Sequence, residues 1–139
     1  MQTNNLDFYE ITLYSDLARD LKVKGHILMD DTESTGTGTS TYMAIYLTSG
    51  GNFALYKVYK TQWQGSSNKY LSKIVKSTKD FIGFFGLGDQ AKYLYKRFNE
   101  TQFCIENNID VDYTISEDKF LENGNPAQEH QDLNEFDNY

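Results

Sequence analysis

The chain has 139 residues, a formal net charge of -7 and one cysteine, Cys104, so an intrachain disulfide is excluded. A chain of this length is expected to form one domain that buries its own core without a disulfide or a metal. No apolar stretch approaches the roughly 20 residues that span a bilayer, and the first residues lack the pattern of a secretory leader, so we expect a cytoplasmic protein.

The first part of the chain predicts two strands joined by a short helix. Residues 8–14 alternate between apolar and polar side chains, which is the period of a half-buried strand. Ser15 is a suitable N-cap for a short helix that ends near Leu21, and residues 22–29 predict the second strand. Residues 30–40 contain only polar residues and glycine, so they predict a loop or a wide hairpin end.

The clearest local structure is a central hairpin. Residues 41–48 and 53–60 flank a Ser-Gly-Gly-Asn segment, and paired glycines allow the positive φ angles of a two-residue turn. With Gly50 and Gly51 as that turn, the register predicts a core face made of Met43, Ile45, Leu47, Ala54, Tyr56 and Val58. The opposite face then carries Tyr42, Ala44, Tyr46, Phe53, Leu55, Lys57 and Tyr59. This face is too aromatic to meet only water, so a helix covers it or it binds a ligand.

The second half of the chain predicts helices followed by strands. Residues 71–85 carry apolar side chains at helical spacing, with an extended start over residues 70–76 as the alternative. Two glycines then break the chain, and residues 89–100 predict a second amphipathic helix. Short strands are predicted at residues 103–105 and 109–115 because apolar and polar residues alternate there.

These elements predict a single α+β domain over residues 1–115, with a small antiparallel sheet and two helices after the central hairpin. Their order permits an OB-like barrel, a fold that commonly binds single strands on its sheet face, although other α+β arrangements fit as well. Residues 116–139 combine acids and amides with few apolar residues, so they predict an acidic tail rather than part of the core.

The charges are divided unevenly along the chain. Residues 55–100 carry nine Lys or Arg against three acids, whereas residues 101–139 carry one Lys against ten acids. Cations interleaved with aromatic rings suit an unpaired nucleic-acid strand, because cations attract phosphates and bases stack on rings. We therefore predict binding of single-stranded nucleic acid, with DNA favoured over RNA and the choice between the two left open. The alternative is that the cations are solvated and the rings are packed in the core. The predicted binding residues are Tyr42, Tyr46, Phe53, Lys57, Tyr59, Lys60, Trp63, Lys69, Lys73, Lys76, Lys92, Lys96 and Arg97.

The tail supports this prediction. Its last part contains Asp132, Leu133, Glu135, Phe136, Asp137 and the final Tyr139. These residues resemble the tails of bacterial and phage single-stranded-DNA-binding proteins, which are acidic and end in an aromatic or apolar residue that docks into partner proteins. The resemblance covers only about the last eight residues and implies protein contacts through them. An acidic tail can also fold back onto its own basic groove, and an ordinary solvating tail is the alternative.

No residue pattern identifies a reaction. The spacing of His26, Asp30, Asp31 and Glu33 matches no metal-ligand motif, and these acids lie in a predicted loop. Cys104 has no histidine partner in the predicted domain, so it is expected to be a buried structural thiol. We predict a non-enzymatic protein without a metal or a cofactor.

A second hypothesis comes from the acidic residues. Phages and plasmids make small acidic proteins that inhibit host nucleic-acid-handling proteins, with carboxylates in the place of phosphates. In that case the partner is a basic protein rather than a nucleic acid. The contact groups would be Asp30, Asp31, Glu33, Asp110, Asp112, Glu117 and Asp118.

Overall fold

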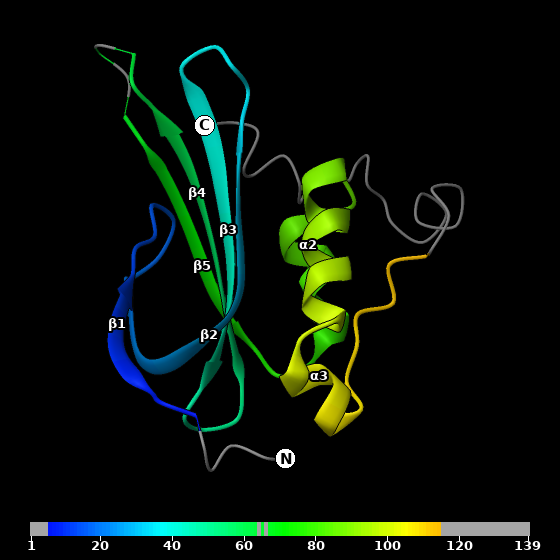
Figure 1. Cartoon of the computed structure of the whole chain (residues 1–139). Helices are drawn as coiled ribbons and strands as arrows, with labels where there is room; N and C mark the ends of the chain where they lie inside the picture. Colours follow the sequence, from blue (N-terminus) through cyan, green and yellow to red (C-terminus); the bar gives the residue numbers. More distant parts are fainter. Residues whose placement is uncertain (1–5, 64, 66, 115–139) are drawn as a thin grey trace.

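The computed structural model describes residues 6–63, 65 and 67–114. Five antiparallel strands form one sheet in the order β1-β2-β3-β4-β5, and short helices follow the last strand (Figure 1). The strands are β1 (Tyr9–Leu13), β2 (Leu21–Ser34), β3 (Thr39–Thr48), β4 (Phe53–Thr61) and β5 (Lys69–Val75). The helical elements are η1 (Thr78–Asp80), α1 (Phe81–Phe85), α2 (Asp89–Asn99) and α3 (Gln102–Asn107).

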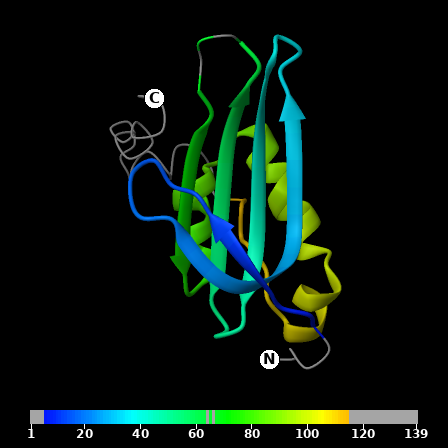
Figure 2. The same cartoon turned by 90° about the vertical axis from the view of Figure 1, so that its left-hand side faces the viewer.

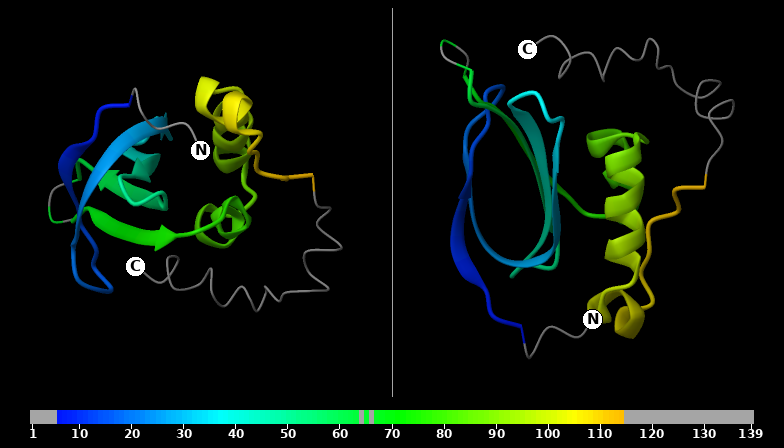
Figure 3. Two further views of the ribbon diagram at one scale, coloured as in Figure 1. Left: turned by 90° about the horizontal axis from the view of Figure 1, so that it is seen from below. Right: turned by 45° about the horizontal axis from the view of Figure 1, so that its top comes forward.

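The sheet curls into a half-barrel, with β1 lying across its concave face and the helices covering the opposite face (Figures 1 and 3). The α+β class with a small antiparallel sheet is therefore as predicted, and the curl of the sheet is OB-like. All helices follow the five strands, so the sheet is a continuous meander. None of the helices in the described part of the chain is long and apolar enough to cross a membrane.

Both faces of the central strands are buried, which explains why β3 and β4 read as nearly continuous apolar runs. The helix-side face of the sheet bears Met43 and Ile45 and packs against α1 and α2. The concave face bears Ala44 and Val58 and forms a second, smaller core inside the half-barrel. The helix-side core contains Leu47, Phe53, Leu55, Val75, Phe81, Phe85, Leu94, Tyr95 and Phe98, and the concave core adds Leu13, Ala54 and Tyr56.

The chain after β1 closes one end of the half-barrel against β5. The backbone N–H of Asp16 donates to the carbonyl oxygen of Tyr70 (3.0 Å), and the backbone N–H of Tyr70 donates to the Asp16 carboxylate (2.9 Å). The rings of Tyr14 and Tyr70 meet edge to face at 5.6 Å. β1 and β5 are therefore joined at this corner without forming a regular strand pair.

The central hairpin is present, but its register differs from the predicted one. The backbone N–H of Gly51 donates to the carbonyl of Thr48 (2.9 Å), and Gly51 has a φ of 88°, so the loop contains three residues instead of two. Leu47 consequently lies opposite Phe53 and not opposite Ala54. A shift of one residue moves every side chain of one strand to the other face. The predicted core face was therefore wrong for β4: Phe53 and Leu55 share a face with Met43, Ile45 and Leu47, whereas Ala54, Tyr56 and Val58 lie on the concave face.

Two elements near the first hairpin also differ. The helix predicted after Ser15 is absent: the Ser15 hydroxyl accepts hydrogen bonds from the N–H groups of Leu17 and Ala18, but Leu21 already pairs with Leu13. This pairing leaves too little chain for a helix. The polar segment predicted over residues 30–40 is a hairpin end, because β2 extends to Ser34 and β3 begins at Thr39.

The start of the helix predicted over residues 71–85 is wrong, and the extended alternative at residues 70–76 is confirmed by β5. The apolar residues of this segment fit the period of a helix and also the period of a strand. The segment forms a strand because it pairs with the free edge of β4. The strand predicted at residues 103–105 is α3, capped by the Thr101 hydroxyl, which accepts from the N–H of Cys104 (3.3 Å). Asn108, with a φ of 56°, ends this helix.

The strand predicted from residue 109 is also absent over the described residues, which run in an irregular path to Thr114. The backbone of Val111 is hydrogen-bonded to the side chain of Asn99 and not to a neighbouring strand. The Asn99 amide group donates to the carbonyl of Val111 (3.1 Å), and its oxygen accepts from the N–H of Val111 (2.8 Å). Val111 is thereby buried against the helices.

Candidate nucleic-acid interface

The residues predicted to bind nucleic acid lie on several different surfaces. Phe53 is only 3% exposed, and its ring contacts Phe81 (5.2 Å between centroids) and Phe98 (6.3 Å) under the helices. A base cannot stack on it. The prediction for Phe53 was wrong because it depended on the two-residue turn, which placed this ring on the outer face of the hairpin.

One group of predicted residues does converge. Lys57 and Tyr59 of β4 point to the helix-side face, and so do Lys69 and Lys73 of β5. We call these four residues the basic patch. Lys69 lies directly opposite Tyr59, and Lys57 lies opposite Leu71, between the two β5 lysines. Diagonal neighbours in an antiparallel pair are about 7–8 Å apart, which is within reach of one flexible strand of phosphates.

The surroundings of the basic patch favour an anion. Lys73 is exposed, whereas Lys57, Tyr59 and Lys69 are half-buried. Among the described residues, no position of β4 or β5 that faces the helix side carries an acidic side chain. The acids of this face, Asp31 and Glu33, lie on β2, two strands away from β4. The face is therefore negative at its β2 edge and positive at its β5 edge, and clustered cations attract polyanions.

Tyr42 and Tyr46 lie on the concave face, on the opposite side of the sheet from Lys57. The Tyr42 hydroxyl donates to the Asp30 carboxylate (3.0 Å), and Lys60 Nζ lies 5.4 Å from the centre of the Tyr42 ring. Burial raises the pKa of Tyr42 and of Tyr46, with Asp30 adding to the effect, so both phenols remain neutral at physiological pH. These two rings cannot form one stacking platform with Tyr59, contrary to the prediction.

The cations of α2 lie on the helix and not on the strands of the sheet. Lys92 and Lys96 are exposed on the flank of the helix away from Gln90, whose side-chain amide donates to the carbonyl of Thr41 on the sheet (2.9 Å). Arg97 lies nearer that contact, where its guanidinium donates to the Tyr93 hydroxyl (2.8 Å). These charges are solvated helix residues. They are not paired with the strand residues of the basic patch. Lys76 is exposed after the end of β5 and is not paired with them either.

Trp63 is 59% exposed in the connection between β4 and β5. Its indole nitrogen lies 3.0 Å from the position that a Cβ on Gly38 would occupy, so the ring rests against the β2–β3 turn. Figure 2 shows the β2–β3 and β4–β5 connections at the same end of the sheet. Trp63 is therefore a rim residue of that end and not part of the basic patch.

Several carboxylates proposed as phosphate substitutes already have donors within the chain. Asp30 accepts from Tyr42, and Asp31 accepts from Gln90 Nε2 (3.3 Å). Asp112 accepts from both the N–H and the hydroxyl of Thr114, which lowers the pKa of Asp112. Glu117 and Asp118 lie outside the described residues, as do all the tail residues from Asp132 to Tyr139.

The candidate reactive side chains have structural contacts. His26 Nδ1 lies 3.0 Å from the carbonyl oxygen of Asp7, and the His26 ring meets the Phe8 ring edge to face at 6.3 Å. Within residues 6–63, 65 and 67–114, no group of three or more His, Cys, Asp or Glu side chains is placed to hold a metal ion. Cys104 is 1% exposed, and burial raises the pKa of its thiol, so the thiol is protonated and shielded.

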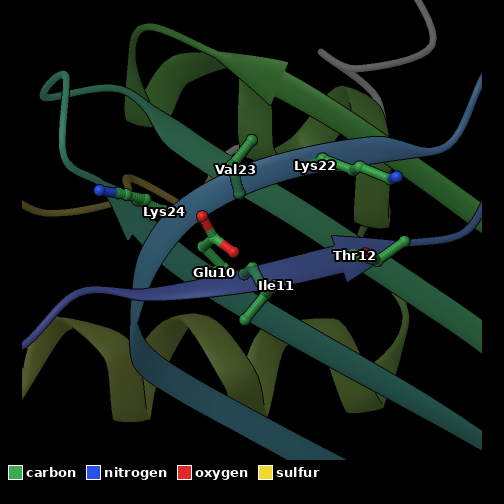
Figure 4. A pocket seen from close by; sticks show the side chains of 6 residues that line it. All are labelled: Glu10, Ile11, Thr12, Lys22, Val23 and Lys24. Atoms are coloured by element: carbon green, nitrogen blue, oxygen red, sulfur yellow. The ribbon is translucent and has the colours of Figure 1, made fainter.

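A hollow of about 400 Å³ lies along the β1–β2 ribbon (Figure 4). In Figure 4 the side chains of Lys22 and Lys24 extend in opposite directions along the ribbon, with the Glu10 carboxylate between them. Glu10 pairs with Lys24, and Thr12 pairs with Lys22, across the two strands. Among the residues that the structure describes, no aromatic ring lines this hollow and no predicted site residue contributes to it.

Sequence reasoning missed the row of tyrosines on the concave face. Tyr56 and Tyr70 lie there with Tyr42 and Tyr46, and the rings of Tyr42 and Tyr56 meet edge to face at 6.3 Å. Alternation over residues 69–75 was the available signal for Tyr70, but the helical spacing of its neighbours concealed it.

Comparison with known proteins finds no matching family model, no matching curated protein and no matching solved structure.

Proposed function

We propose that this protein binds single-stranded nucleic acid, DNA rather than RNA, through the basic patch on the helix-side face of β4 and β5. The observation that carries the proposal is the grouping of Lys57, Lys69 and Lys73 on one face of β4 and β5, with the half-buried Tyr59 directly opposite Lys69. Three cations neutralise successive phosphates, while a tyrosine ring offers a face on which one base stacks. The same proposal includes that the protein binds nucleic acid without catalysing a reaction.

The binding is mainly electrostatic, so its salt dependence is the first test. Single strands release counterions with a slope of about -0.7 per neutralised phosphate, which gives a slope of about -2 in log Kobs against log salt for three lysines. Titration of the full chain with a labelled oligothymidylate at several salt concentrations measures this slope. Affinity that is no higher at low salt than that of an unrelated acidic protein would sink the proposal.

A matched pair of variants localises the site. The double change Lys57→Glu with Lys73→Glu reverses two charges in the basic patch and should abolish most of the binding. The double change Lys22→Glu with Lys24→Glu alters the net charge by the same amount on the β1–β2 ribbon, where both lysines are exposed, and should leave most of the binding intact. Equal losses in the two variants would show that only overall charge matters. Circular dichroism confirms that both variants are folded.

The nucleic-acid proposal has more support than the acidic inhibitor. Asp30, Asp31 and Asp112 already accept hydrogen bonds from the chain, so binding a basic partner would break or share those bonds. Purification from a lysate with and without nuclease separates the two functions, because the first carries nucleic acid and the second carries a basic protein. Contacts with a protein partner through residues 132–139 remain part of the proposal.

A further inference from the structure

A shallow groove of about 550 Å³ lies at the end of the half-barrel, between the β2–β3 turn and the last residues of β4. The strand register determines which side chains form the floor of the groove. Ser34, Ser40 and Lys60 lie in one row across β2, β3 and β4 on the concave face, and Thr32 lies in the next row opposite Tyr42. Figure 2 shows this end of the sheet, where the β2–β3 and β4–β5 connections lie.

The groove is lined by neutral polar groups, and several of them are not used by the fold. Its described lining consists of Ser and Thr hydroxyls, the amide of Gln62, two glycines and one cation, Lys60. Within the described part of the chain, the side chains of Thr32, Ser40 and Gln62 make no hydrogen bond to another residue. A hydroxyl donates one hydrogen bond and accepts two, so these groups suit a ligand that itself carries hydroxyls.

Two aromatic residues, Trp63 and Tyr42, adjoin residues of the groove lining. Trp63 follows Gln62, is 59% exposed and rests against Gly38, which also lines the groove. Tyr42 lies in the next row of the floor and is half-buried. Both side chains present an apolar ring face and a polar tip, which allows one ring to contact the C–H groups of a ligand while nearby groups bind its oxygens.

The charge of the groove excludes other classes of ligand. Among the described lining residues Lys60 is the one cation, and its Nζ lies over the Tyr42 ring, whose hydroxyl donates to the Asp30 carboxylate. A polyanion needs several converging cations, which this groove does not provide. An apolar ligand needs an apolar wall, and all lining side chains are polar or absent.

We propose that this groove binds a neutral carbohydrate, with the hydroxyls of Thr32 and Ser40 and the amide of Gln62 on its oxygens and the Trp63 ring against its C–H face. Its volume is within the range of about 300–1,000 Å³ that is typical of small-molecule sites. Thr32, Ser34, Ser40 and Lys60 of the groove lie on the concave face, whereas the basic patch is on the helix-side face. The carbohydrate site is therefore separate from the proposed nucleic-acid site and does not depend on it.

The test uses the full chain and its one tryptophan, which is excited at a wavelength that tyrosine does not absorb, so the emission reports on Trp63. Neutral oligomers of glucose, galactose, mannose and N-acetylglucosamine are titrated to about 10 mM, a range that includes weak binding. At least one oligomer should change the Trp63 emission. The double variant Thr32→Val with Ser40→Ala should weaken that binding about tenfold. The control Thr12→Val, on β1 and outside the groove, should bind like the parent.

Two results would overturn the inference. One is that no oligomer in the set changes the Trp63 emission or the backbone amide resonances of Thr32 and Ser40. The other is that an oligothymidylate, and no carbohydrate, changes the emission and loses this effect in Lys60→Gln. Because Lys57→Glu with Lys73→Glu leaves the groove residues unchanged, carbohydrate binding should persist in that variant. Failure of the nucleic-acid proposal and failure of this one are therefore separate outcomes.

Discussion

The hydroxyl of Tyr95 donates a 2.6 Å hydrogen bond to the carbonyl oxygen of Gly86, which joins the middle of α2 to the turn that ends α1. Tyr95 is fully buried, and its hydroxyl also lies 3.3 Å from the carbonyl of Phe81. Both helices pack on the helix-side face of the sheet, so this bond fixes their relative position.

Tyr95→Phe should lower the free energy of unfolding by about 1–2 kcal/mol, because the variant leaves a mostly enclosed carbonyl without its donor. Chemical denaturation measures the change. Tyr93→Phe is the matched control, since Tyr93 is 48% exposed on the same helix and should change stability by no more than about 0.5 kcal/mol. Equal effects of the two changes would contradict the role given to Tyr95.

Stability should also fall at alkaline pH. Burial raises the pKa of Tyr95 above its ordinary value of 10.0, so above about pH 10 the unfolded state releases a proton that the folded state retains. The stabilising contribution is complete below that pH and is lost as the pH rises through the range between the two pKa values. Burial shifts Tyr42, Tyr46 and Tyr56 in the same direction.

Urea midpoints measured from about pH 8 to 11 test this expectation. The parent protein should lose stability steeply above about pH 10, and Tyr95→Phe should lose it less steeply, because one of the shifted groups is removed. An identical slope for the parent and the variant would show that Tyr95 does not contribute to the alkaline transition.

The glycines of the central turn should differ in their tolerance of a side chain. Gly51 has a φ of 88° and Gly50 does not have a positive φ, although neither has a crowded environment. Gly51→Ala should therefore destabilise by about 1–2 kcal/mol through backbone strain alone, whereas Gly50→Ala should be close to neutral. Thermal or chemical unfolding of the two variants distinguishes this three-residue loop from a two-residue turn, which needs a positive φ at its first glycine, Gly50.

Phe53 and Tyr59 lie on the same face of β4 and should behave differently. Phe53→Ala removes a buried ring from the helix-side core and should cost about 3–5 kcal/mol of stability. Tyr59→Ala should cost much less stability but should weaken oligonucleotide binding by about 1–3 kcal/mol, since one stacked base is lost. A folded Phe53→Ala variant with normal stability would contradict the core assignment.

Removal of residues 116–139 should strengthen nucleic-acid binding at low salt. This segment contains seven acids and one lysine, so it carries six of the seven net negative charges of the chain. The gain should shrink at high salt because screening weakens the repulsion between the tail and the oligonucleotide. A full-length variant in which those seven acids become amides is the matched control, and it should show the same gain. Weaker binding in both proteins would contradict this electrostatic account.

Much of the fold could be predicted from local patterns. Helix α2 was predicted over residues 89–100 and extends from Asp89 to Asn99, because its apolar stripe and its preceding glycine are both local signals. The central hairpin was predicted for the same reason. The prediction was wrong where two local interpretations had similar strength: Leu71, Ile74 and Val75 fit a helix or a strand, and the free edge of β4 selected the strand.

The candidate site shows the same division. Alternation along β4 is enough to place Lys57 and Tyr59 on one face, whatever the turn. Their meeting with Lys69 and Lys73 requires β5 to be a strand paired in one register, which no local pattern determined. The predicted face of Phe53 depended on the length of the turn, which differs by one residue from the predicted length. The prediction that identified Lys57 therefore also placed Phe53, a core residue, on the binding surface.

The sequence by itself determined the α+β class, the central hairpin, α2 and the division of charge between a basic middle and an acidic end, because each follows from the composition and period of a short segment. Only the tertiary structure decided the hairpin register, the strand character of residues 69–75 and which lysines meet. Those features depend on hydrogen bonds between segments distant in the chain, whose free energy is not contained in any one of them.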